Sequence, residues 1–80
     1  MHRIFFDTND GTYELGYILW FQHSLCDIAA IGDELREGLH VIICSPNELE
    51  MEGVLAFDKE LGFWRAIPVL GTTKMLDGSS

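Results

Sequence analysis

The sequence predicts one small α+β domain that consists mainly of antiparallel β-strands. Its 80 residues suffice for a single domain. Most segments alternate apolar and polar residues, which is typical of half-buried strands, and one segment has helical spacing instead. Hydrophobic residues make up 48% of the chain, so even a short chain can build a core. We expect five strands and one helix in the order ββαβββ over residues 1–70, followed by a flexible tail over residues 71–80.

Two alternating segments near the N-terminus flank the dipeptide Asp10-Gly11. This dipeptide is typical of a two-residue type I′ turn, in which both residues need a positive φ. The predicted hairpin pairs Thr8 with Tyr13, Phe6 with Leu15 and Ile4 with Tyr17 on one face. The opposite face would carry three more apolar side chains, those of Phe5, Ile18 and Trp20. This hairpin therefore needs cover on both faces.

A helix is predicted to begin at Ser24, because Ser24 and Asp27 fit a loose capping box. Apolar residues then recur at helical spacing, at Leu25, Ile28, Ala29, Gly32 and Leu35. The helix has two candidate ends, Gly32 and Gly38. A stop at Gly38 would place three carboxylates at the negative end of the helix dipole, so the stop at Gly32 is favoured. These carboxylates belong to Asp33, Glu34 and Glu37.

Three further strands are predicted over residues 39–44, 48–57 and 63–67. A Ser-Pro-Asn turn and a loop over residues 58–62 separate them. In the middle strand Leu49 and Met51 are expected to point inward, while the glutamates between them point outward. This spacing resembles that of the central strands of an SH3-like barrel, which implies a partly closed barrel. A resemblance at the level of the fold implies no function.

The charge balance argues against two classes of partner. Thirteen acidic residues against five basic ones give a net charge of −8. Binding to nucleic acids and to anionic membranes draws on lysine and arginine, so neither partner is expected. The longest apolar run, around residues 17–21, is far shorter than the ~20 residues of a membrane span. With only two cysteines and no signal-peptide pattern at the start, we expect a cytoplasmic protein.

A zinc site is suggested by spacing and excluded by strand geometry. His23 and Cys26 are three positions apart, and His40 and Cys44 are four apart. If residues 39–44 form a strand, His40 and Cys44 are ~13 Å apart at ~3.3 Å per residue. Two ligands of one zinc ion cannot be so far apart. We therefore predict no metal site and no cofactor.

The acidic loop over residues 7–11 gives a hint of cation binding. It lacks the glycine and the glutamate that a calcium loop needs at its sixth and twelfth positions. In the predicted hairpin, however, Asp7 lies opposite Glu14, and such a like-charge pair is destabilising unless a cation intervenes. A small-ligand or cation-binding domain is therefore an alternative function.

Catalysis is the least supported alternative. Glu50 and Glu52 are ~6.6 Å apart along one strand face, a spacing that carboxylate pairs use. An open sheet face, however, offers no pocket that would separate their pKa values. Cys26 lies near the predicted helix start with His23 beside it, but no third group orients the histidine. No catalytic residue is predicted.

The favoured hypothesis is a non-catalytic interaction or regulatory protein. Its partner would be a basic protein or a second copy of the chain, because charge complementarity steers association while apolar contacts supply affinity. The residues predicted to bind that partner are Glu48, Glu50, Glu52 and Trp64. The sequence leaves open whether Trp20 and Trp64 lie in the core or on the surface.

Overall fold

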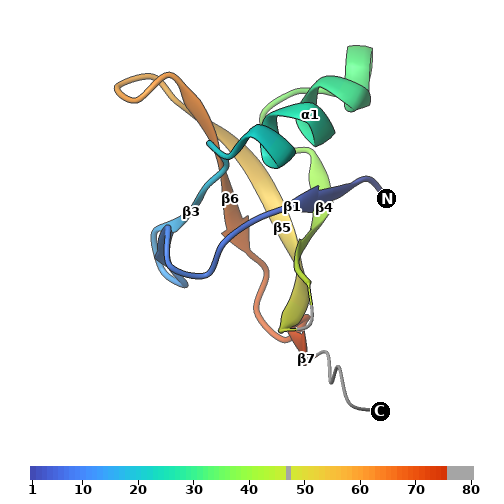
Figure 1. The fold of residues 1–80 in the computed structure, drawn as a ribbon, viewed down its shortest axis with the longest axis vertical. Coiled ribbons are helices and arrows are strands. Elements are labelled where there is room, and N and C mark those ends of the chain that lie inside the picture. The colour runs from blue at the N-terminus through green and yellow to red at the C-terminus, as the bar shows by residue number, and fades with distance from the viewer. Residues whose placement is uncertain (47, 76–80) are drawn as a thin grey trace.

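A computed structural model of the protein describes residues 1–46 and 48–75. These residues form seven strands, one α-helix and one short 3-10 helix (Figure 1). In chain order they are β1 (Arg3–Phe5), β2 (Gly11–Thr12), β3 (Gly16–Ile18), α1 (Gln22–Ile31), η1 (Gly32–Glu34), β4 (His40–Ser45), β5 (Leu49–Asp58), β6 (Phe63–Pro68) and β7 (Lys74–Met75). The predicted α+β class is confirmed. Residues 76–80 of the predicted tail lie outside the described residues.

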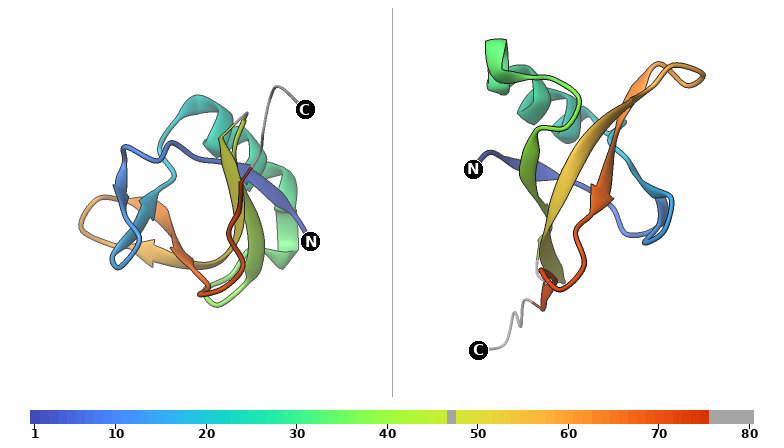
Figure 2. Two further views of the ribbon diagram at one scale, coloured as in Figure 1. Left: turned by 90° about the horizontal axis from the view of Figure 1, so that it is seen from below. Right: turned by 180° about the vertical axis from the view of Figure 1, so that it is seen from behind.

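All strands belong to one sheet with the order β1-β4-β5-β6-β3-β2, and β7 pairs with β5. The pairing of β1 with β4 is parallel and the other pairings are antiparallel. Seen from below, the strands curve around a common interior (Figure 2). Within the described residues β1 and β2 do not pair, so the sheet is not closed and the SH3-like barrel is not confirmed.

The predicted N-terminal hairpin is wrong, and with it the order ββαβββ. Gly11 pairs with Tyr17, and the turn between β2 and β3 lies at residues 13–15. Glycine is needed at position 11 because β2 and β3 approach each other closely there. A Cβ on Gly11 would lie 2.1 Å from the carbonyl oxygen of Gly16. The chain instead bends after β1, where the carboxylate of Asp7 accepts the N–H of Asn9 at 2.8 Å. This bend lets β1 pair with β4 rather than with β2.

Helix α1 ends as predicted and begins earlier than predicted. It ends at Ile31, and Gly32 follows with a φ of 69°. Ser24 and Asp27, which the sequence assigned to a capping box, lie inside the helix. Ser24 Oγ donates to the carbonyl oxygen of Phe5 at 2.6 Å, and Asp27 Oδ2 accepts the N–H of Phe5 at 2.9 Å. These side chains therefore form hydrogen bonds with the backbone groups of Phe5 at the outer edge of β1, as a neighbouring strand would.

The core lies between the inner face of the sheet and α1, which contributes Ile28 and Ile31. The predicted alternation along β5 is confirmed, since Met51 is buried and the flanking Glu50 and Glu52 point outward. The structure also decides the position of the two tryptophans. Trp20 is exposed, whereas Trp64 packs against the core. The largest fully buried apolar side chains are Phe6, Ile4, Leu19, Ile43, Leu55 and Val41.

Candidate functional site

The predicted acidic row, defined as Glu48, Glu50 and Glu52, is partly neutralised by the protein itself. The guanidinium of Arg3 donates to Glu50 at 2.5 Å, from β1 across β4. Nδ1 of His40 lies 2.5 Å from Glu52 Oε2. The hydrogen bond and the charge of Glu50 raise the pKa of Arg3 above its usual range, so the guanidinium keeps its positive charge. The acidic row therefore carries less net negative charge than its sequence suggests.

The two other neighbours of the acidic row come from distant parts of the chain. Glu48 is exposed, and its carboxylate lies 3.4 Å from the hydroxyl of Thr8. Lys74 of β7 is the strand partner of Glu50. Sequence reasoning missed these neighbours because they come from segments far from the row in sequence.

Trp64 does not lie with the acidic row. Its ring packs against the core on the inner side of β6, at an edge-to-face distance of 5.3 Å from the ring of Phe57. Glu50 and Glu52 lie on the outer side of the first half of β5. The structure thus brings Glu50 and Glu52 together and separates Trp64 from them.

A second surface consists of aromatic rings and is here named the aromatic strip. It runs from the start of β6 across residues 20–21 to β1 and the start of α1. Its members are Phe63, Trp20, Phe21, Phe5 and His23. The centroid of the Trp20 ring lies 6.3 Å from that of Phe63, Phe21 lies 5.8 Å from Phe5, and Phe5 stacks on His23 at 4.9 Å. Sequence reasoning placed Phe5 and Trp20 on the second apolar face of the predicted hairpin and considered His23 only for metal binding and catalysis. It missed Phe21 and Phe63.

Three rings of the aromatic strip are exposed, those of Trp20, Phe21 and His23. Trp20 is 49% exposed and Phe21 is 37% exposed. Leu25, one helical turn after Phe21, adds a further exposed apolar side chain. Aromatic side chains with this much exposure are enriched where proteins bind one another. The adjacent pair Trp20-Phe21, directly before a helix, was the sequence signal for this surface.

A cavity of about 250 Å³ adjoins one end of the aromatic strip. Its lining includes Cys44, His23 and Asp27, with His23 Nε2 at 3.8 Å from Asp27 Oδ2. The sequence had considered His23 with Cys26, but Cys26 is exposed and contacts Gln22 instead. The volume lies below the ~300 Å³ at which small-molecule sites usually begin. Among the described residues no three potential ligands are placed to hold a metal ion.

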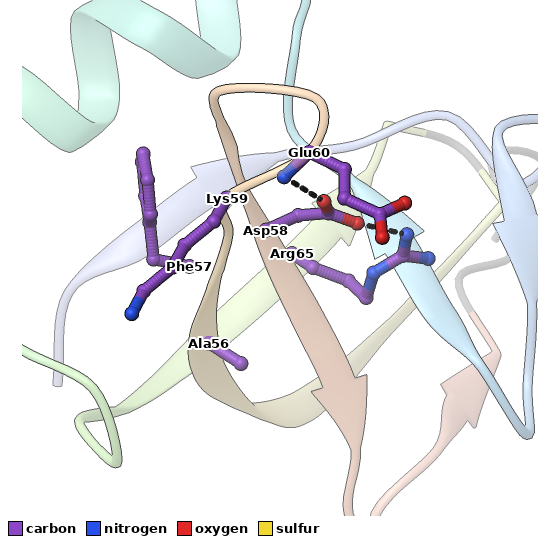
Figure 3. Close-up of a pocket in the computed structure, with 6 residues that line it drawn as sticks. All are labelled: Ala56, Phe57, Asp58, Lys59, Glu60 and Arg65. Atoms are coloured by element: carbon purple, nitrogen blue, oxygen red, sulfur yellow. Dashed lines mark hydrogen bonds and ion pairs between the residues drawn. The ribbon is translucent and has the colours of Figure 1, made fainter.

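A larger open cavity of about 430 Å³ lies at the end of the β5–β6 hairpin (Figure 3). There Asp58 Oδ2 pairs with Arg65 at 2.7 Å, and Asp58 Oδ1 accepts the N–H groups of Glu60 and Leu61. The hydrogen bond from Arg65, followed by that from Leu61, lowers the pKa of Asp58. All these interactions order the hairpin turn, so we assign Asp58 a structural role.

Acid is expected to weaken this hairpin through Asp58. Its folded-state pKa lies below the ordinary value of 3.8, so the stabilisation is fully present above that value. It is lost as the pH falls through the lowered folded-state pKa. We expect Asp58→Asn to destabilise the protein at neutral pH and to flatten the loss of stability below about pH 4. Urea unfolding at a series of pH values measures this. An unchanged acid limb in Asp58→Asn would contradict it, and Glu37→Gln, at an exposed position, is the control.

The pair proposed for cation binding is not formed. Asp7 and Glu14 are not strand partners, because β2 pairs with β3 through Gly11 and Thr12. Asp7 instead caps the bend after β1. In the same bend, Asp10 Oδ2 is buried without a hydrogen-bond partner among the described residues.

Comparison with known proteins identifies no relative, since no family model, no curated protein and no solved structure matches this chain. Within residues 1–46 and 48–75, no helix combines the length and the apolar character that crossing a membrane requires.

Proposed function

We propose that this protein is a non-catalytic interaction protein that binds a basic polypeptide through the aromatic strip. The observation that carries the proposal is the exposure of Trp20, which leaves about half of its surface in contact with water. A side chain of this size gains most when a partner covers it, because aromatic rings bury ~150–250 Å² each. Tryptophan is also among the residues that dominate binding energies.

The surroundings of Trp20 support a role in binding. Its ring meets Phe63 edge to face, which fixes its orientation before a partner arrives. The neighbouring Phe21 is held in the same way by Phe5, whose backbone is fixed by Ser24 and Asp27. The exposed rings thus rest on ordered elements. Less conformational entropy is lost on binding when contact residues are already ordered.

The net charge of −8 favours a basic partner over a second copy. Two copies would bring like charges together, which opposes association, whereas a basic partner would be attracted. In this proposal the acidic row of Glu48, Glu50 and Glu52 contributes to the rate and selectivity of encounter. Trp64 lies outside the aromatic strip and packs against Phe57 and the core, so this proposal gives it no direct contact with the partner.

A role without catalysis is supported by the state of the residues that chemistry would need. Glu50 and Glu52 are engaged by Arg3 and His40 on an open sheet face. Asp58 is engaged by Arg65 and by the turn that it orders. These ion pairs and hydrogen bonds are structural, and they support a role without catalysis.

Trp20→Ala is expected to weaken partner binding strongly and to leave the fold intact. We expect at least about a thirtyfold loss of affinity for a partner isolated from cell extract, because a central tryptophan typically contributes about 2 kcal/mol or more. Binding should also weaken as the salt concentration rises. Affinity purification followed by titration calorimetry measures both effects.

Leu15→Ala is the matched control for Trp20→Ala. Leu15 is 69% exposed and lies in the β2–β3 turn, outside the aromatic strip. Its removal should not change binding. The proposal fails if Trp20→Ala keeps full affinity, or if sedimentation shows a dimer that Trp20→Ala dissociates.

A further inference from the structure

The first half of β5 is covered along one edge by the C-terminal strap, defined as residues 69–75. Met75 and Lys74 of β7 pair with Leu49 and Glu50. The N–H of Val69 donates to the carbonyl oxygen of Glu52 at 2.9 Å. The strap lies at the opposite end of the molecule from α1 (Figure 1). It is therefore remote from the start of α1, where the aromatic strip ends.

The strap covers this edge in an irregular way. The N–H of Glu52 donates to the side-chain hydroxyl of Thr72 at 3.0 Å, where a regular strand would offer a carbonyl oxygen. Within the described residues, which end at Met75, the regular ladder with β7 is two residues long. Leu70 is 81% exposed and Met75 is 72% exposed, so the strap buries little apolar surface. A cover held by so few interactions is easily displaced, and an uncovered edge binds other strands.

The side chains along this edge define what a replacing strand would need. Leu49 and Met51 point inward, while Glu50 and Glu52 point outward. A strand that continues the sheet must therefore alternate apolar residues toward the core with cationic residues toward the glutamates. The strap has this order of residue types over its two paired residues, because Lys74 lies opposite Glu50 and Met75 lies opposite Leu49, although Met75 itself is largely exposed.

We propose that this edge of β5 is a strand-addition site for an extended segment in which basic and apolar residues alternate. In the free protein the C-terminal strap occupies this edge, and the partner segment displaces it. The site lies apart from the aromatic strip, so this proposal goes beyond the function proposed above. In this proposal the acidic row selects partners in which basic residues alternate with apolar ones. It does not simply attract any positively charged partner.

The first test loosens the strap in the full-length protein. Thr72→Val removes the hydroxyl that bonds Glu52 and the carbonyl oxygen of Val69, and keeps the shape of the side chain. Thr73→Val is the matched control, because among the described residues the hydroxyl of Thr73 reaches only the sulfur of Met51, at 4.0 Å. The probe is a fluorescent peptide of alternating lysine and valine, and fluorescence anisotropy measures its binding. A peptide with the same residues in two blocks controls for charge.

We expect Thr72→Val to bind the alternating peptide about fivefold more tightly than the unaltered protein, because the strap reduces the fraction of molecules with an open edge. Thr73→Val should bind like the unaltered protein. The block peptide should bind weakly and equally to all three. Equal binding of the two peptides would overturn the proposal, because the row would then attract charge without pairing as a strand.

The second test locks the strap. Leu49→Cys with Met75→Cys places two thiols at paired positions, in a chain that also carries Cys26→Ser and Cys44→Ser. We expect the oxidised form to lose binding of the alternating peptide and the reduced form to regain it. Binding that is the same in both forms would overturn the proposal. Trp20→Ala should leave this binding unchanged, so failure here is distinguishable from failure of the aromatic strip.

Discussion

Phe6→Ala is expected to lower the free energy of unfolding by about 3–5 kcal/mol, as large-to-small substitutions of buried aromatic residues do. The side chain of Phe6 is completely buried, and its ring lies 4.9 Å from the ring of Tyr17. Its N–H also donates to the carbonyl oxygen of Cys44 and so continues the pairing of β1 with β4. Because small domains are stable by only about 5–15 kcal/mol, this loss is expected to populate the unfolded state.

Urea titration followed by tryptophan fluorescence measures the effect of Phe6→Ala. Leu15→Ala is again the control, since removal of an exposed side chain should change stability by no more than about 0.5 kcal/mol. A loss below about 1 kcal/mol for Phe6→Ala would mean that the ring is not part of the core. The parallel pairing of β1 with β4 would then need revision, because it is what directs Phe6 inward.

Gly11→Ala is expected to destabilise the protein by about 2–3 kcal/mol, the upper range for overpacking. The added Cβ would lie 2.1 Å from the carbonyl oxygen of Gly16 and 2.9 Å from the Cα of Tyr17. Both are backbone atoms, so β2 and β3 would have to separate. The φ of Gly11 is not positive. Without the clash, alanine would stabilise the protein, because it restricts the conformations of the unfolded chain. The clash alone makes the expected change in the free energy of unfolding unfavourable.

Gly38→Ala is the matched control for Gly11→Ala. A Cβ at Gly38 meets no atom within 4 Å, and the only cost is the φ of +85°. We expect a loss of about 1–2 kcal/mol there. Thermal unfolding of the two variants gives the comparison. If Gly11→Ala is as stable as the unaltered protein, Gly11 does not lie close to the backbone of Gly16 and Tyr17, and the β2–β3 pairing is wrong.

The candidate sites were predicted only in part. Alternation placed Glu50 and Glu52 on the outer face of β5 correctly. It could not predict that Arg3 and His40 would contact them, because this depends on which strands become neighbours. The same limit applies to the packing of Trp64 against the core, because it depends on distant strands. Its role in partner binding stays a prediction. The exposure of Trp20 follows from its place after β3, beside Phe63.

The sequence by itself determined what depends on neighbouring residues: the α+β class, the end of the helix at Gly32, and the inward and outward faces of β5. These features follow from backbone preferences and from periodicity, which act within a few residues. Only the tertiary structure decided that β1 pairs with β4. An Asp-Gly turn favours a hairpin by a small local free energy, whereas the observed pairing buries Phe6 and lets Ser24 and Asp27 satisfy the edge of β1. The free energy gained by burying the ring of Phe6 exceeds the local preference of Asp-Gly for a turn. This burial depends on residues far away in the chain, so local sequence patterns do not predict it.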